Sequence, residues 1–587
     1  MDMLNCKVNG IAVSVPAGST ILEAARAAGI EIPTLCYMKE INAIGACRIC
    51  VVEATGARGL VPACVYPVTE GMEIQTNNAK IQAARKTTLE LILSTHDKKC
   101  LSCPRSTNCE LQKLCNDYGV TASQFEGFNP HYEIDDSAPH LVRDNNKCIL
   151  CRRCIAVCNQ QFVGILGAND RGIDTNIGQA FKLNLNDTPC ISCGQCTVVC
   201  PTGALTEKDD TEQVWAALAD PSKHVVMMTA PAVRAALGEE FGMPIGTLVT
   251  GKMVSALRRL GFKKVFDTNF GADLTIMEEA TELMDRIQNG GTLPMITSCC
   301  PGWVNYAEIN CHELHPHLSS CKSPQEMFGA ILKSYYCEKN GIDPKDMFVV
   351  SVMPCTGKKY EKDRAELSVN GLQDVDAVLT TRELGKLIRR SGIQFTKLPD
   401  EEFDNDIVGD YTGAGVIFGA TGGVMEAALR TAAYMLTNNE IEPVALHAVR
   451  GLEGVKEATY NLAGKEIRVA VAHGMKNAQP LLDEIQQGTS KYHFIEIMAC
   501  LGGCIAGGGQ PYVQPCFLPN EDANILDTFR AKRAAALYQE DESKALRASH
   551  KNPQIKTLYE SYLEKPNSHK AHELLHTHYI PREKFPD

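Results

Sequence analysis

The chain has 587 residues, a formal net charge of −12 and 44% hydrophobic residues. Since a domain usually has roughly 100 to 200 residues, this length predicts a multidomain protein. The negative charge argues against a nucleic-acid partner, because binding a phosphate backbone needs a basic surface. No apolar run reaches about 18 residues, and the first residues do not resemble a signal peptide. We therefore expect no membrane association and a cytoplasmic location.

Cysteine is strongly over-represented, with 26 residues in the chain and 17 of them before residue 201. In a secreted protein this number would indicate disulfides. Without a signal sequence, metal sites and scattered core thiols are the two alternatives. The spacing of the cysteines distinguishes between them.

The first cysteine group predicts a 2Fe-2S domain over residues 1–79. Residues 7–30, KVNGIAVSVPAGSTILEAARAAGI, indicate a strand, a turn, a second strand and a helix, as in the β-grasp of plant-type ferredoxins. The spacing differs from the plant form. It resembles the N-terminal domain of the electron-carrying subunit of respiratory NADH dehydrogenases, which shares IPTLCY and GACRICVVEATG; a zinc site is the alternative. The expected ligands are Cys36, Cys47, Cys50 and Cys64.

A second group, in the predicted domain 80–135, combines one imidazole with three thiols in a His-x3-Cys-x2-Cys-x5-Cys pattern. Alone it would fit a zinc site equally well. Its position between two iron-sulfur modules favours a His-ligated 4Fe-4S cluster. The expected ligands are His96, Cys100, Cys103 and Cys109.

The predicted domain 136–209 contains two Cys-x2-Cys-x2-Cys-x3-Cys runs, which are typical of bacterial two-cluster ferredoxins. In that pattern three cysteines of a run hold one 4Fe-4S cluster and the fourth ligates the other. A pair of zinc sites is the alternative, although zinc rarely needs two such compressed runs. The rule assigns one cluster to Cys148, Cys151, Cys154 and Cys200. It assigns the other to Cys158, Cys190, Cys193 and Cys196.

From about residue 210 apolar strands alternate with amphipathic helices, which predicts an α/β domain. Four apolar segments lead directly into unusual loops: HVVMMT into APAVRAALGE, TLPMIT into SCCPGW, MFVVSVM into PCTGKK, and YHFIEIM into ACLGGCIAGGG. Ligands of open α/β sheets bind beyond the carboxyl ends of strands, so we expect these loops to meet in one crevice. Four cysteines there predict a fifth cluster, with a structural zinc left open: Cys300, Cys355, Cys500 and Cys504.

Three of these loops resemble the signatures of the iron-only (FeFe) hydrogenases. TSCCPxW, MPCxxKK and MxCxxGCxxGGGQP are met by residues 297–303, 353–359 and 498–511. The N-terminal cysteine groups match the larger members of that family, so the resemblance covers essentially the whole chain. It implies reversible H2 oxidation and proton reduction in a large two-lobed α/β catalytic domain, residues 210–587. Electrons would pass along the N-terminal clusters.

The resemblance also implies a cofactor and its ligands. Members of the family carry an H-cluster, a 4Fe-4S cubane joined through one cysteine sulfur to a di-iron unit with CO, cyanide and a bridging dithiolate that bears an amine. By position, Cys504 joins the two parts, the other three loop cysteines complete the cubane, and Lys358 donates to one cyanide. Many relatives have Ser at position 232, so only a main-chain donor is expected there. The residues expected around the di-iron unit are Pro231, Ala232, Gln325, Met353, Phe418 and Met498.

The adjacent cysteines in SCCPGW are expected to have different tasks. Cys300 would hold iron, whereas by resemblance Cys299 stays free and passes a proton to or from the bridging amine. In TIMEEATELMDRI, Glu279, Glu282 and Arg286 share one face of a helix. That segment alone favours a solvated face with a Glu282–Arg286 pair. The resemblance instead identifies these residues, with Ser319, as a proton path from solvent to Cys299.

Two other functions compete with a hydrogenase. A non-catalytic assembly-type relative would leave Lys358 and Cys299 without a task. A sensory hydrogenase would be expected to carry a signalling domain. The expected electron partner is ferredoxin, a NAD(P)- and flavin-binding protein, or both. No Rossmann or flavin motif occurs here, so nicotinamide chemistry would belong to another chain.

Three remaining features receive simpler interpretations. HELLH, residues 572–576, satisfies the zinc-protease pattern but lacks a third ligand, so we expect a solvated or packed C-terminal helix. Leu501 follows a ligand cysteine where relatives often have His or Pro, and it cannot donate a hydrogen bond to sulfur. The cysteines outside every pattern are expected to be buried thiols: Cys6, Cys115, Cys311, Cys321, Cys337 and Cys516.

Overall fold

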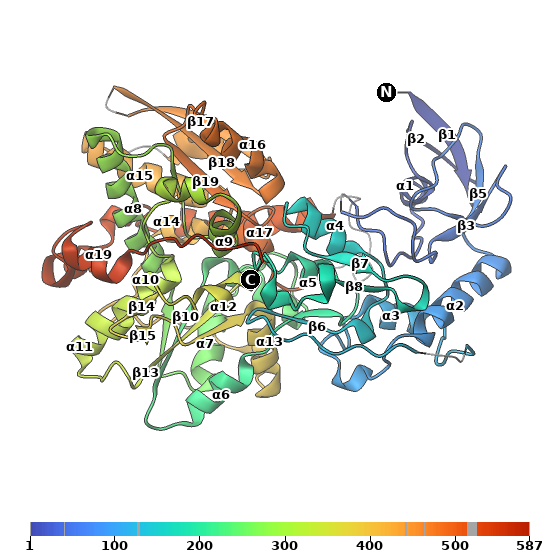
Figure 1. Ribbon diagram of the computed structural model, residues 1–587, viewed down its shortest axis with the longest axis horizontal. Coiled ribbons are helices and arrows are strands. Elements are labelled where there is room, and N and C mark those ends of the chain that lie inside the picture. The colour runs from blue at the N-terminus through green and yellow to red at the C-terminus, as the bar shows by residue number, and fades with distance from the viewer. Residues whose placement is uncertain are drawn as a thin grey trace. The chain divides into compact units, whose positions relative to one another are not determined.

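The computed structural model describes residues 2–39, 41–125, 129–440, 443–462, 464–513 and 525–585. The chain forms two compact units, each continuous in space but not in sequence (Figure 1). The first unit comprises Met1–Thr188, Gln195–Thr206 and Val513–Leu526, and the second comprises Pro189–Gly194, Glu207–Tyr512 and Asp527–Asp587.

The first unit begins with a five-stranded mixed sheet in the order β2-β1-β5-β3-β4. The strands are β1 (Met3–Val8), β2 (Ile11–Pro16), β3 (Val51–Ala54), β4 (Val61–Pro62) and β5 (Glu73–Gln75). Asn9 and Gly10, both with positive φ, form the tight turn between β1 and β2. Helix α1 (Ile21–Ala27) begins with a capping box in which Thr20 and Glu23 satisfy each other's main-chain N–H groups. The predicted order of strand, turn, strand and helix is confirmed.

The rest of this unit consists of short elements between the cysteine loops. Its helices are α2 (Ala79–Ser94), α3 (Glu110–Asp117), α4 (Arg153–Gln160) and α5 (Gln195–Val199). Its strands are β6 (Leu141–Arg143), β7 (Gly167–Asn169), β8 (Asn176–Gly178) and the start of β9 (Leu205–Glu207). Buried Arg153 on α4 forms an ion pair of 2.7 Å with Glu110 on α3 and donates to the Tyr37 carbonyl oxygen at 3.1 Å. One side chain therefore connects three cysteine-bearing segments.

The second unit contains two sheets. The first is parallel throughout, in the order β11-β10-β13-β16. Its strands are β10 (His224–Thr229), β11 (Lys264–Asp267), β13 (Met347–Met353) and β16 (Ala377–Thr380). The strands are almost entirely buried, as expected of a parallel sheet with both faces covered.

The second sheet has the order β12-β19-β18-β17, with one antiparallel pair at its β17 edge. Its strands are β12 (Met295–Ile296), β17 (Val455–Leu462), β18 (Lys465–His473) and β19 (Phe494–Met498). Sequence patterning predicted a longer strand over TLPMIT, but only two residues pair with β19. The four strands that precede the predicted loops are nevertheless all present.

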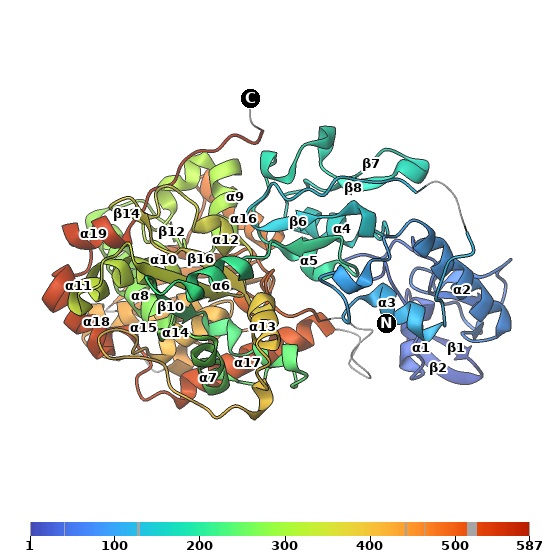
Figure 2. The same ribbon diagram turned by 90° about the horizontal axis from the view of Figure 1, so that it is seen from below.

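Helix α8 (Asn269–Asn289) lies at the centre of the second unit. It packs against α10 (Pro324–Ile331), α14 (Gly413–Val416) and α15 (Gly423–Thr437), as both views show (Figures 1 and 2). Most of its residues are buried, including the polar Asp273, Glu278 and Glu279. Buried carboxyl groups on a central helix need specific partners, and several of these partners come from the C-terminal segment.

The remaining helices of the second unit surround its two sheets. They are α6 (Thr211–Ala219), α7 (Thr250–Leu260), α9 (Pro301–Asn310), α11 (Cys337–Asn340), α12 (Gly357–Glu361), α13 (Thr381–Arg390), α16 (Met475–Gln486), α17 (Ile525–Ser543), α18 (Pro553–Leu558) and α19 (His569–Leu575). A search of the described residues for a helix both long and apolar enough to cross a bilayer finds none.

Candidate active site

The four predicted loops of the second unit meet around one apolar cavity of about 80 Å³. The loop after β10 contributes residues 230–232, the loop after β12 contributes 299–301, and the loops after β13 and β19 contribute 353–355 and parts of 498–507. The carboxyl ends of strands from both sheets therefore face the same space, as sequence patterning predicted.

All four cysteines expected to ligate the fifth cluster line this cavity: Cys300, Cys355, Cys500 and Cys504. Burial raises the pKa of each thiol. Neighbouring thiols raise it further for Cys355, Cys500 and Cys504, whereas main-chain N–H donors oppose the rise for Cys300. For Cys355 the pKa reaches about 11. Four thiolates in one apolar cavity are unfavourable unless a cationic group compensates them. A soft, sulfur-binding metal cluster supplies that compensation.

Glycines let the main chain approach the cavity closely. A Cβ on Gly507 would lie 2.1 Å from the Pro354 carbonyl oxygen, and one on Gly503 would lie 2.7 Å from the Thr421 nitrogen. Gly503 also has a positive φ of 90°, which other residues rarely adopt. The loop that carries Cys500 and Cys504 can therefore be this compact because the residues at positions 503 and 507 have no side chain.

The polar groups of the cavity form one cluster around Lys358. Its Nζ lies 2.7 Å from Glu361 Oε2 and donates to the Cys299 carbonyl oxygen at 3.1 Å. Burial disfavours the ammonium, but the Glu361 carboxylate and the nearby thiols more than offset this, so the pKa of Lys358 is raised. Gln325 Nε2 also donates to Glu361, at 2.9 Å, while its buried Oε1 has no hydrogen-bond partner in the described part of the chain.

An ammonium and four sulfurs in one apolar cavity fit a bound anionic iron-sulfur group. Glu361, which positions the ammonium, was missed by sequence analysis. Its spacing of three residues from Lys358 in α12 was the available signal. The structure also places the other predicted cofactor contacts on the cavity wall: Pro231, Ala232, Met353, Phe418 and Met498.

The two adjacent cysteines have different surroundings. Cys300 Sγ accepts a hydrogen bond of 3.4 Å from the Ala499 main-chain nitrogen in the opposite cysteine loop. Cys299 also lines the cavity, and burial followed by the charge of Glu279 raises its pKa well above the usual value. Cys299 therefore remains a protonated thiol at neutral pH, and the carboxyl group of Glu279 lies near it.

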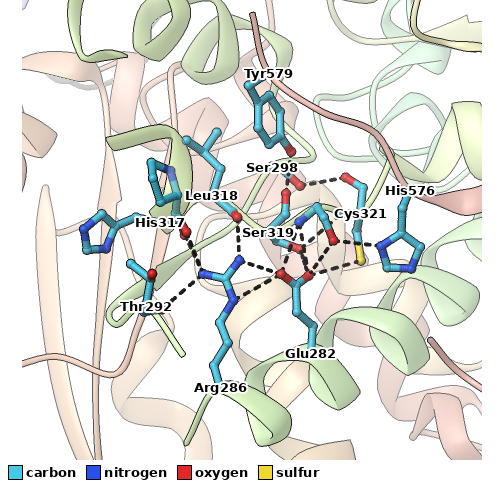
Figure 3. Close-up of polar contacts among 12 residues, drawn as sticks. Glu282, Arg286, Thr292, Ser298, His317, Leu318, Ser319, Cys321, His576 and Tyr579 are labelled. Atoms are coloured by element: carbon cyan, nitrogen blue, oxygen red, sulfur yellow. Dashed lines mark hydrogen bonds and ion pairs between the residues drawn. The ribbon is translucent and has the colours of Figure 1, made fainter. Parts of the chain in front are cut away.

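Glu279, Ser319, Glu282 and Arg286, the residues of the predicted proton path, are neighbours in the structure. Burial and then the negative charge of Glu282 raise the pKa of Glu279 to about 8, while the neighbouring Ser319 lowers it. Ser319 also donates to Glu282 Oε2 at 3.0 Å, and Arg286 Nη2 lies 2.5 Å from Glu282 Oε1 (Figure 3). The Glu282–Arg286 pair expected from the helix face exists, but it is largely buried rather than solvated.

The predicted 2Fe-2S ligands of the first unit lie close together. Cys36 and Cys47 exchange two N–H···S hydrogen bonds of 3.4 Å, and the sulfurs of Cys50 and Cys64 are 3.4 Å apart. A hydrogen bond between the Cys36 and Cys64 side chains also contributes to the shifted pKa of each thiol, which connects the two pairs. The cysteines around GACRIC thus form one group of sulfurs.

His96 has the properties of a neutral metal ligand. Burial lowers its pKa to about 4, and its Nδ1 has no partner among the residues that the structure describes. Of the three accompanying cysteines, Cys109 is buried near Cys103. Burial, and to a smaller extent Cys103, raises the pKa of the Cys109 thiol. Cys115, expected outside the pattern, is buried near Cys100 and Cys109.

Cys148, Cys151, Cys154 and Cys200 line a second cavity, which lies wholly within the first unit. This grouping takes three cysteines from one run and the fourth from the other, as the two-cluster pattern requires. The twin set belongs to both units and stays a prediction: Cys158, Cys190, Cys193 and Cys196.

The cysteines expected as buried thiols are buried at five of the six positions, namely Cys6, Cys115, Cys311, Cys321 and Cys337. Cys516 lies outside the described residues. HELLH lies at the end of α19, where the side chain of His576 is packed into the protein and that of His572 is exposed.

Comparison with known proteins places these features in a family. Residues 223–508 match the family "Iron only hydrogenase large subunit, C-terminal domain", and residues 527–582 match "Iron hydrogenase small subunit". The N-terminal matches are "2Fe-2S iron-sulfur cluster binding domain" (1–79), "NADH-ubiquinone oxidoreductase-G iron-sulfur binding region" (85–124) and "4Fe-4S dicluster domain" (147–204). The protein is thus an iron-sulfur protein with a hydrogenase-type catalytic domain.

The relatives extend this match to the full chain. The chain is 50% identical to NADP-reducing hydrogenase subunit HndD of Solidesulfovibrio fructosivorans, over 100% of both chains. It is 45% identical to iron hydrogenase 1 of Clostridium pasteurianum, over 97% of this chain and 99% of that one. A structure of a variant of the [FeFe]-hydrogenase HydA1 of Chlamydomonas reinhardtii matches 64% of this chain and 100% of that chain, with 44% identity and a TM-score of 0.56. The chain belongs to the family of iron-only hydrogenases.

Proposed function

We propose that this chain catalyses the reversible oxidation of H2 to protons and electrons. One observation carries the proposal. Cys299, a thiol outside the set of four predicted ligands, lines their cavity and lies close enough to Glu279 for that carboxylate to affect its pKa. A purely structural metal site needs neither this thiol nor a chain of buried carboxyl groups behind it.

The cofactor proposed for the cavity is the H-cluster of the family. Cys300, Cys355, Cys500 and Cys504 would hold its 4Fe-4S part, with Cys504 joining it to a di-iron unit that bears CO, cyanide and a bridging dithiolate. When bound, the cluster supplies the redox-active iron and the base at which H2 is activated. The apolar wall of the cavity, including Met353, excludes bulk water from this chemistry.

Lys358 and Gln325 are proposed to orient the cofactor. The raised pKa of Lys358 keeps it charged, so it supplies a cation beside an anionic group, and Glu361 fixes its position. Gln325 has an amide oxygen still able to accept a hydrogen bond. The main-chain N–H of Ala232 is proposed as a further donor to the cofactor, and Pro231, which has no N–H, lines the cavity beside it.

The proposed proton path consists of Cys299, Glu279, Ser319 and Glu282, with Arg286 beside it. The thiol of Cys299 exchanges a proton with Glu279, whose pKa of about 8 lets it hold that proton at neutral pH. Ser319 connects the two carboxyl groups. Arg286 neutralises Glu282 and fixes its orientation.

The accessory clusters proposed for the chain are one 2Fe-2S and three 4Fe-4S clusters. We assign them to domains 1–79, 80–135 and 136–209, with 210–587 as the catalytic domain. Closely spaced centres of this kind conduct electrons between a protein surface and a buried site.

The proposed electron partner is a NAD(P)- and flavin-binding protein, with ferredoxin as the alternative. The description of HndD as an NADP-reducing subunit supports the first. The test is H2-dependent reduction of NADP+ by the complex purified from its native source, compared with reduction of ferredoxin by the isolated chain. A cytoplasmic location is proposed with this assignment.

The function itself is tested on anaerobically purified, maturated protein. We expect infrared bands from CO and cyanide together with H2-dependent dye reduction. Bands without turnover would favour a sensory relative. Absence of both after full maturation would favour the assembly-type relative, in which Cys299 and Lys358 have no task.

A further inference from the structure

Arg286, at the outer end of the proposed path, holds its own proton permanently. Its guanidinium donates to Glu282 at 2.5 and 3.1 Å and to the main-chain carbonyl oxygens of residues 292 and 316–318 at 2.8 to 3.4 Å (Figure 3). An arginine stays protonated at every pH that a protein tolerates, and these contacts use its donors. Arg286 therefore positions Glu282, while a proton that leaves Glu282 needs another acceptor.

His576 is linked to Glu282 through one hydroxyl group. Ser320 Oγ lies 3.2 Å from Glu282 Oε2 and 2.8 Å from His576 Nδ1. Figure 3 shows the imidazole facing Glu282 from the C-terminal segment. Ligand-type atoms of Glu282, Cys321 and His576 all lie within 4.8 Å of one another. An imidazole has two ring nitrogens, one of which can accept a proton while the other donates one, so the side chain of His576 is suited to relay protons.

His576 is buried just below the protein surface. The residue follows α19 directly, is 8% exposed, and has the exposed His572 beside it with 4.0 Å between ring centroids. Its second ring nitrogen, Nε2, lies 3.1 Å from Glu278 Oε2. Main-chain hydrogen bonds of 2.8 Å, from Thr577 to Ser320 and from Lys322 to Leu575, hold the segment in place.

We propose that His576 carries protons between Glu282 and the surface, with the Ser320 hydroxyl as the bridge. The inference rests on the proposed function, because it extends the proton path of that reaction. It assigns a task to the histidine of HELLH, which sequence analysis left as part of a packed or solvated helix.

This proton transfer between Glu282 and His576 needs no electron and no co-reactant. In the outward direction the Glu282 carboxylic acid gives its proton to Ser320 Oγ, and the Ser320 hydroxyl gives its own proton to Nδ1 of the neutral imidazole. The imidazolium then releases its Nε2 proton to water, and exchange with surface water restores the first tautomer. Proton reduction uses the same steps in reverse.

The test compares His576→Gln with His569→Gln in the maturated holoenzyme. Glutamine keeps hydrogen-bonding capacity but does not titrate, and His569 is exposed on α19, the helix that His576 follows. We expect turnover to fall about tenfold or more in His576→Gln, with KM for H2 unchanged and no loss in His569→Gln. Free imidazole should restore part of the turnover in His576→Ala, which a purely structural role would not allow.

The pH profile provides a second readout. The titratable groups that face His576 are Glu278 and Glu282 on α8, Cys321 on the segment before α10, and His572 on α19. The hydroxyl of Tyr559 donates to Glu278. These groups remain in His576→Gln. The pH profile of turnover should therefore differ from wild type in this variant and match wild type in His569→Gln.

A readout independent of turnover uses protein that lacks the di-iron unit. Because the pKa of Glu279 is about 8, its carboxyl group is protonated at neutral pH and gives an infrared band, identified by its loss in Glu279→Gln. After mixing into D2O, the isotopic shift of this band should be about tenfold slower in His576→Gln than in wild type. His569→Gln should match wild type.

Wild-type exchange and turnover rates in His576→Gln would overturn the inference. So would a loss of turnover that imidazole does not restore, accompanied by a lower unfolding temperature, because that result indicates a structural role. A wild-type holoenzyme without H2 turnover would refute the proposed function instead, while the carboxyl exchange would still test His576.

Discussion

The cysteine cavity and the proton path beside it are constructed in opposite ways. The cavity has four identical predicted ligands, placed just beyond the ends of strands from two sheets. The path combines a thiol, carboxyl groups, a hydroxyl and an imidazole from segments up to several hundred residues apart. A change in the cavity should therefore remove the cofactor, whereas a change in the path should slow protons while the cofactor stays in place.

The largest effect is expected from Cys504→Ala. Removing the sulfur proposed to join the two parts of the cofactor should abolish the CO and cyanide infrared bands and reduce H2 turnover below detection. The N-terminal clusters should remain visible by electron paramagnetic resonance. Cys337→Ala, at a buried thiol among apolar core residues, is the matched control and should keep both bands and turnover.

Cys299→Ser tests the proton path rather than the cysteine cavity. We expect iron content and infrared bands near normal, with turnover reduced by about a hundredfold or more, because the proton loses its first acceptor outside the cofactor. Dye reduction and iron analysis on the same sample measure both. Loss of iron in this variant would show that Cys299 is a ligand and that the division between the two cysteines is wrong.

Glu279→Gln should change the pH dependence of turnover. Burial and Glu282 raise the pKa of Glu279 to about 8, so the carboxyl group keeps its proton at neutral pH and loses it as pH rises through that value. The rate of proton reduction by the wild type should fall over this range. The variant should be slow at every pH without that fall. Exposed Glu338→Gln should retain the wild-type profile.

The smallest effect is expected from Ala232→Ser. Because the main-chain N–H at this position is the proposed donor, an added hydroxyl should contribute only about 0.5 kcal/mol, or about twofold in rate. One cyanide band should shift while turnover stays close to wild type. A gain of tenfold or more would show that the main-chain donor alone is insufficient.

The cavity was largely predictable because its information is local. A cysteine spacing or a strand that leads into a loop is visible in a few consecutive residues. The shared edge of the strands then follows from α/β architecture. Cys300 and Cys355 could thus be grouped although 55 positions separate them. Resemblance to a family, rather than spacing, was still needed to choose iron over zinc.

The path was predictable only in part because burial and tertiary contacts define it. The helix face of Glu279, Glu282 and Arg286 is visible in the sequence, but the same pattern is typical of a solvated helix. Nothing local indicates that His576 approaches Glu282, from 294 residues away. Glu361 was missed for a related reason, since a carboxylate three residues from a lysine is common on exposed helices.

An electron-density map of anaerobically grown crystals, with anomalous data collected at the iron edge, tests the central claim most directly. The account predicts iron bound to the sulfurs of Cys300, Cys355, Cys500 and Cys504, and an unligated sulfur at Cys299. A map with iron bound to Cys299, or with a single zinc among the four cysteines, would contradict it.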